Sequence, residues 1–169
     1  MKKLIGSLLT AFFLFAPLSP VQADSTIVRI VSPAHQTFTG EFRNDDLAQE
    51  LTPSGRLGQL VYVSASRSKI WVIDPALIDE VIAMTGEYKL ATDAEPLGSK
   101  IASDWLTQLQ KVTRANEVIA LAYGNPDVNL AKSLAPSELK MYYAFGKSQL
   151  QIALGSIVRS EPYGGWITG

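Results

Sequence analysis

The chain has 169 residues, of which 47% are hydrophobic, and it carries no cysteine and a formal net charge of −1 at pH 7. A charge so close to zero gives no electrostatic reason to bind nucleic acid or an anionic membrane surface. Without cysteine, the chain has no disulfides, no thiolate chemistry and no cysteine-ligated zinc.

The first 23 residues have the pattern of a secretory signal peptide. Lys2 and Lys3 precede an apolar stretch from Leu4 to Ala16, and residues 21–23, Val-Gln-Ala, offer small side chains at a cleavage site. The stretch is shorter than the roughly 20 residues that a spanning helix needs, and no other apolar stretch approaches that length. We expect cleavage before Asp24, a secreted or cell-envelope location and no membrane span in the mature chain.

Residues 24–169 predict a single domain in which strands alternate with helices. The predicted strands are Thr26–Val31, Lys69–Ile73, Asn116–Tyr123 and Ile157–Arg159, and the predicted helices span residues 45–51, 56–64, 75–86, 101–114, 126–134 and 136–154. Parallel strands require crossover connections of this kind, so the predicted fold class is α/β. Two architectures fit: a small open sheet, or the front part of an incomplete β/α barrel. The ending after Trp166 without a further helix favours the barrel, and the domain is then truncated.

Two motifs place polar side chains where predicted strands end. Trp71–Glu80 reads WVIDPALIDE and Ala120–Asn129 reads ALAYGNPDVN. In each motif an apolar run ends in Asp or Asn, then proline, then a helical pattern. If the strands are parallel, Asp74, Asn125 and Asp127 gather at the carboxyl edge of the sheet, where α/β proteins usually bind ligands.

The same motifs resemble conserved blocks of an uncharacterised family of large exported actinobacterial envelope proteins. The matching stretches are FRNDDLAQELTPSGRLGQL from Phe42 to Leu60, then WVIDPALIDEV, then EVIALAYGNPDVNLA, in the same order and with similar spacing. Members of that family are much longer and usually carry a transmembrane helix near their far end. The resemblance covers the chain from about Ile27 onward and implies an exported N-terminal domain. It supplies no chemistry, since the family has no established activity. The domain is loosely similar to the β/α barrels of glycoside hydrolases and polysaccharide deacetylases, which is an analogy of fold alone.

Glycoside hydrolysis commonly needs two carboxylates on either side of the scissile bond. Asp74 and Asp127 are the candidate catalytic pair, with Asp74 the more buried and hence the proton carrier, and Asp127 its ionised partner. The alternative interpretation gives both residues a structural role. Asp74 then caps a helix through its side chain, and Asp127 in the first turn of the next helix favours the helix dipole. Asn125 has the same capping alternative.

Aromatic residues near the strand ends suggest a ligand-binding set instead. Trp71 and Tyr123 are candidates for stacking on a sugar ring beside Asp74, Asn125 and Asp127. Both faces of the run from Ile70 to Ile73 are apolar, however, and this pattern favours a Trp71 that packs under a helix.

The single histidine restricts the metal chemistry that the chain could perform. A metal-dependent deacetylase needs a carboxylate with two histidine ligands, and only His35 exists. The surrounding SPAHQT has turn composition, so we expect His35 on the surface of a loop. We expect no metal and no other cofactor.

Three functions therefore stay open. The first is a noncatalytic envelope module that binds a cell-wall glycan or an envelope protein. The second is a carbohydrate-active hydrolase that uses the strand-end carboxylates. The third is a truncated fragment without activity. Since no catalytic constellation is complete, the sequence leaves open whether the protein is an enzyme.

Overall fold

The computed structural model of the chain describes residues 25–63, 68–92 and 94–160. The predicted signal peptide, its cleavage site and the residues around Trp166 lie outside the described residues.

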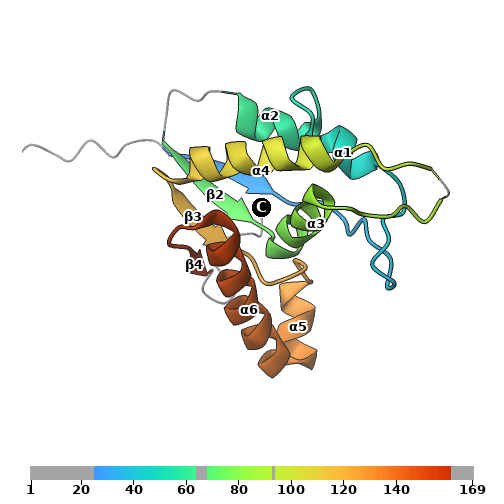
Figure 1. Cartoon of the computed structure of the whole chain (residues 1–169). Helices are drawn as coiled ribbons and strands as arrows, with labels where there is room; N and C mark the ends of the chain where they lie inside the picture. Colours follow the sequence, from blue (N-terminus) through green and yellow to red (C-terminus); the bar gives the residue numbers. More distant parts are fainter. Residues whose placement is uncertain (1–24, 64–67, 93, 161–169) are drawn as a thin grey trace, which may run out of the picture.

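Four parallel strands form one open sheet in the order β1-β2-β3-β4 (Figure 1). The strands are β1 (Thr26–Ile30), β2 (Lys69–Ile73), β3 (Glu117–Ala120) and β4 (Arg159–Ser160). Ile30 pairs with Ile73, and Ile73 pairs with Ala120, so the chain leaves the first three strands at the same edge. The predicted parallel α/β fold is confirmed, and of the two architectures the described residues form the open sheet.

The helices that connect the strands follow the predicted order. They are α1 (Asp46–Leu51), α2 (Arg56–Tyr62), α3 (Pro75–Thr85), α4 (Ser99–Thr113), α5 (Val128–Leu134) and α6 (Pro136–Leu154). Their ends differ slightly from the prediction, as in α4, which begins at Ser99 rather than Ile101. Gly155 ends α6 in the left-handed conformation at φ 61°, as its position after the helical pattern predicts.

The main core lies on one face of the sheet. Strand residues such as Trp71 and Ile73 share one hydrophobic cluster with side chains from α1, α2, α3, α4 and α6. Figure 1 shows α1, α2 and α4 gathered along one side of β1 and β2. Each crossover steps to the next strand in the same direction, and right-handed crossovers of that kind place their helices on the same face. The opposite face carries a smaller cluster, centred on Val72, Ile119 and Leu121, to which no described helix contributes.

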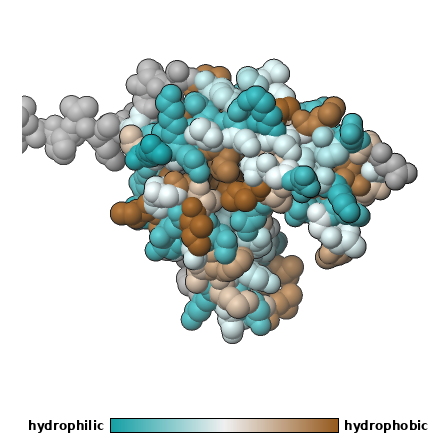
Figure 2. All heavy atoms as spheres, viewed as in Figure 1, coloured by the Kyte–Doolittle hydropathy of each residue, from teal (hydrophilic) through white to brown (hydrophobic). Residues whose placement is uncertain are grey.

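The surface of the described residues is mostly polar. In Figure 2, hydrophobic residues gather in small separate areas, one of them over α5. Leu130 and Leu134 are the exposed large apolar residues of that helix. None of the helices in the described ranges is both long enough and apolar enough to cross a membrane.

Candidate functional site at the carboxyl edge of the sheet

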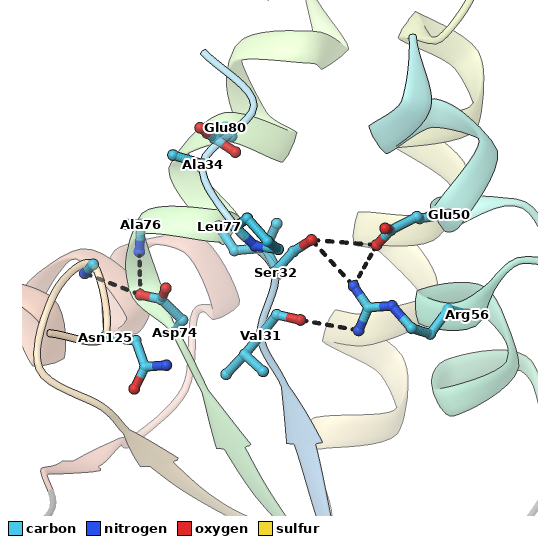
Figure 3. A pocket seen from close by; sticks show the side chains of 12 residues that line it. Val31, Ser32, Ala34, Glu50, Arg56, Asp74, Ala76, Leu77, Glu80 and Asn125 are labelled. Carbon is cyan, nitrogen blue, oxygen red and sulfur yellow. Dashed lines mark hydrogen bonds and ion pairs between the residues drawn. The ribbon is translucent and has the colours of Figure 1, made fainter. Parts of the chain in front are cut away.

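A cavity of about 610 Å³ opens at the carboxyl edge of the sheet (Figure 3). We call it the strand-end pocket. The segments that directly follow β1, β2 and β3 each supply part of its wall, and α1, α2 and the first half of α3 supply the rest. Its lining residues are Val31, Ser32, Pro33, Ala34, Glu50, Arg56, Asp74, Ala76, Leu77, Glu80, Gly124 and Asn125.

Asp74 joins the end of β2 to the start of α3. Its backbone N–H donates to Ile30 O at 3.0 Å, which extends the pairing of β1 with β2 by one residue. The side chain caps α3, as predicted, because Oδ1 accepts from Ala76 N at 3.0 Å. The same oxygen accepts from Gly124 N at 3.1 Å. Oδ2 therefore receives no hydrogen bond from any residue within the described ranges, although Asp74 is only 3% exposed.

Burial raises the pKa of Asp74 from its ordinary value of 3.8 to about 6. The two backbone hydrogen bonds act in the opposite direction, and the nearby negative charges of Glu80 and Asp79 add to the increase. The carboxyl group thus keeps its proton at pH 5 and is mostly ionised at pH 7.

The segment after β3 brings two residues with left-handed backbone to the pocket. Gly124 has φ 76° and Asn125 has φ 44°, and within the described ranges Asn125 is the one residue other than glycine with positive φ. Asparagine tolerates this conformation better than most side chains, yet such residues persist only where the surroundings hold them, often at functional sites. The turn directs the Gly124 N–H to Asp74 and places Asn125 in the pocket wall, as Figure 3 shows.

Arg56 and Glu50 form the opposite wall. The Arg56 guanidinium pairs with Glu50 and also donates to Val31 O at 3.0 Å and to Ser32 Oγ at 3.1 Å. The start of α2 is thereby fixed to the segment after β1 (Figure 3). Both residues lie in the Phe42–Leu60 stretch that carries the resemblance, but the sequence prediction did not single them out as site residues.

Glu80, on α3, holds the loop after β1 in place. Its carboxylate accepts from His35 N at 2.9 Å and from Gln36 N at 3.1 Å, and it contacts His35 Nδ1 at 3.0 Å. Burial alone would raise the pKa of Glu80, but these hydrogen bonds outweigh it and hold the pKa below the ordinary value of 4.5. The prediction of a surface position for His35 is wrong: the residue is in a loop, but its side chain is only 12% exposed because it packs against Glu80.

Replacing Glu80 by glutamine is expected to lower the free energy of unfolding at pH 7 by about 1–3 kcal/mol, since two backbone donors and the imidazole lose their charged acceptor. Because the folded state holds the pKa of Glu80 below 4.5, its contribution is complete above that pH and is lost as the pH falls through the folded pKa. Urea unfolding at pH 7 and at low pH measures both effects. Glu87→Gln, at an exposed position, is the matched control. Equal unfolding midpoints for the two variants at pH 7 would contradict the role assigned to Glu80.

The structure does not bring Asp127 into the strand-end pocket with Asp74. Asp127 is exposed and caps α5, with Oδ1 accepting from Asn129 N and Leu130 N, both at 2.9 Å. It is not among the residues that line the pocket. The carboxylates that share the pocket with Asp74 are instead Glu50 and Glu80.

The two aromatic candidates also lie outside the pocket lining. Trp71 is fully buried on the helix-covered face, as the apolar alternation favours, with Lys69 Nζ 4.9 Å from its ring centroid. It is therefore not accessible for stacking. The Tyr123 hydroxyl donates to Asp79 Oδ2 at 2.9 Å, and its ring meets Phe145 edge-to-face at 4.8 Å. Burial and the hydrogen bond to Asp79 raise the pKa of Tyr123 to about 12, so its hydroxyl stays protonated.

The fold and the pocket define a parallel α/β protein, wound in one direction, whose candidate site lies at the strand ends. Within the described ranges, no group of three or more His, Asp or Glu side chains could hold a metal ion. Comparison of the chain with protein-family models, with curated proteins and with solved structures finds no match.

Proposed function

We propose that this protein is a noncatalytic module of the cell envelope that binds a glycan in the strand-end pocket. The signal-peptide pattern of residues 1–23 supports export. The observation that carries the binding role is the Asp74 carboxylate, which lines a concave cavity and keeps Oδ2 without a hydrogen bond from the described residues. Asn125, in the same wall, adds an amide that both donates and accepts. Sugar hydroxyls need this combination of partners.

The shape of the site favours a glycan over an envelope protein as the ligand. A concave pocket with a few converging polar groups is typical of sites for small molecules or single sugar units. A protein partner would instead need a broad complementary surface.

A hydrolase is the second candidate function, and one observation favours it. A pKa of about 6 suits Asp74 to act as a general acid. However, Glu50 is paired with Arg56, and Glu80 is occupied by the loop after β1. Neither Glu50 nor Glu80 is therefore free to act as the second catalytic carboxylate, and Asp127 lies outside the pocket. Binding without turnover fits these contacts better.

NMR titration of the ¹⁵N-labelled full chain with soluble cell-wall oligosaccharides tests the proposal. The expected result is a set of saturable shifts at the amides of Ala76, Gly124 and Asn125, without release of new reducing ends. Asn125→Ala should weaken the binding at least tenfold. Asp127→Ala should leave it intact while costing about 1 kcal/mol of stability through the lost cap. Shifts confined to amides elsewhere on the protein would contradict the proposed site. Release of reducing ends by the unmodified chain, but not by Asp74→Asn, would establish the hydrolase instead.

A further inference from the structure

The charged groups of the strand-end pocket are unevenly balanced. Three carboxylates, those of Glu50, Asp74 and Glu80, line the pocket, against the single guanidinium of Arg56. Building on the proposed glycan-binding function, we infer that the sugar unit held in the pocket carries a free ammonium group, which pairs with Asp74.

The other charges of the pocket are already compensated. Arg56 forms an ion pair with Glu50 and donates further hydrogen bonds to Val31 O and Ser32 Oγ. Glu80 accepts two backbone N–H groups from the loop after β1. The Oδ2 atom of Asp74 is therefore where the pocket offers a negative charge to a ligand.

The position of Asp74 makes a cation a better partner than a neutral hydroxyl. At 3% exposure the carboxylate has lost most of its hydration, and a neutral donor would leave its charge uncompensated. A charge-assisted hydrogen bond from an ammonium group is roughly twice as strong as a neutral one. An ammonium group also attracts the carboxylate in a poorly solvated environment, where screening is weak.

The same contacts disfavour an anionic ligand. The start of α3 would attract an anion through its backbone N–H groups, but the Asp74 side chain already occupies the Ala76 N–H. The guanidinium that would otherwise bind a phosphate or carboxylate is held by Glu50. Phosphorylated and uronic-acid glycans should therefore be rejected.

Matched tetrasaccharides provide the experiment. The β-1,4-linked tetramers of glucosamine, N-acetylglucosamine and glucose differ only in the group at C2, and 2-aminoethanol offers an ammonium group without a sugar. Each is titrated at pH 7 into the ¹⁵N-labelled full chain. We expect the glucosamine tetramer to bind at least tenfold more tightly than the other two, with shifts at the amides of Ala76 and Gly124.

Two variants separate the charge of Asp74 from its shape. Asp74→Asn keeps an oxygen for the two backbone donors but removes the charge, so it should reduce the preference for the glucosamine tetramer to less than threefold. Asp127→Asn makes the same change outside the pocket and should keep the preference.

The outcomes distinguish the inference from the proposed function. Equal binding of all three tetramers would overturn the ammonium inference and leave the glycan-binding function standing. Equal binding of 2-aminoethanol and the glucosamine tetramer, with no binding of the other tetramers, would support ammonium recognition and overturn glycan binding. Binding of none of the four would overturn both.

Discussion

Asp74→Asn is expected to be more stable than the unmodified chain at pH 8, by roughly 3 kcal/mol, and equally stable at pH 3. The reason is the cost of burying a carboxylate. The folded state raises the pKa of Asp74 from 3.8 to about 6, so folding disfavours its ionised form. Asparagine keeps an oxygen that accepts from Ala76 N and Gly124 N, but it never ionises.

The direction of the pH dependence follows from that pKa. Below pH 3.8 Asp74 is protonated in both the folded and the unfolded chain, and its contribution to stability is complete. As the pH rises toward 6, the unfolded chain loses the proton while the folded chain retains it, and stability falls until both states are ionised. Glu80 has the opposite dependence, since its folded pKa is lowered. Asp79 also has a raised pKa. Glu80 and Asp79 are present both in the unmodified chain and in Asp74→Asn. The difference between the unfolding free energies of these two proteins therefore reports on Asp74.

Urea unfolding of the two proteins at several pH values between 3 and 8 measures this difference. Asp127→Asn is the matched control, since asparagine also caps helices well and Asp127 is exposed. Because the Asp127 side chain is exposed, this variant should not show the gain in stability at pH 8 that is expected of Asp74→Asn. A constant difference between Asp74→Asn and the unmodified chain over the whole range would show that burial does not penalise the Asp74 charge.

Gly58→Ala is expected to lower the free energy of unfolding by about 3 kcal/mol, at the upper end of the cost of overpacking a core. A Cβ atom at Gly58 would lie 1.7 Å from Thr52 O and 2.5 Å from Thr52 C. Both are backbone atoms of the turn between α1 and α2, so no side chain can rotate away to make room. The two helices must separate, and with them Glu50 and Arg56 in the pocket wall.

Thermal unfolding of Gly58→Ala beside Gly86→Ala tests this packing. Gly86 has negative φ, and a Cβ atom there meets nothing within 4 Å, so the control should unfold at the temperature of the unmodified chain. In Gly58→Ala, NMR should also show a shifted amide signal for Ser32, whose hydroxyl oxygen accepts a hydrogen bond from the Arg56 guanidinium. If the two glycine variants unfold at the same temperature, Gly58 does not lie as close to the backbone of Thr52 as the structure shows.

The sequence predicted the elements that depend on local patterns. The apolar run from Lys69 to Ile73, ended by Asp74 and Pro75, marks β2, the start of α3 and the Asp74 cap, because each signal lies within a few residues. The strand predicted at Ile157–Arg159 proved to be the two residues Arg159–Ser160, since so short a strand has no periodicity to detect.

The composition of the pocket depends on contacts between distant parts of the chain, which local patterns do not reveal. Arg56 reaches Val31 O, 25 residues away, and Glu80 reaches His35, 45 residues away. On a helix, such residues look like any other solvent-facing charge. Asp127 shows the converse error. It lies in a motif of the same kind as that of Asp74, and its side chain also caps a helix. That side chain nevertheless lies outside the pocket.

The one-sided arrangement of the helices separates two kinds of positions in this chain. The helices meet the sheet through the main core on a single face, whereas the pocket is built largely from the short segments that follow β1, β2 and β3. Ser32 can therefore be exchanged with little effect on the packing beneath it, whereas Gly124 and Asn125 are restricted by their positive φ. Mutations in one of these segments could change the ligand preference of the pocket while the sheet and helices keep their stability. Asp74 is the most restricted of these positions, because its side chain both caps α3 and lines the pocket. We therefore expect it to vary least among related chains.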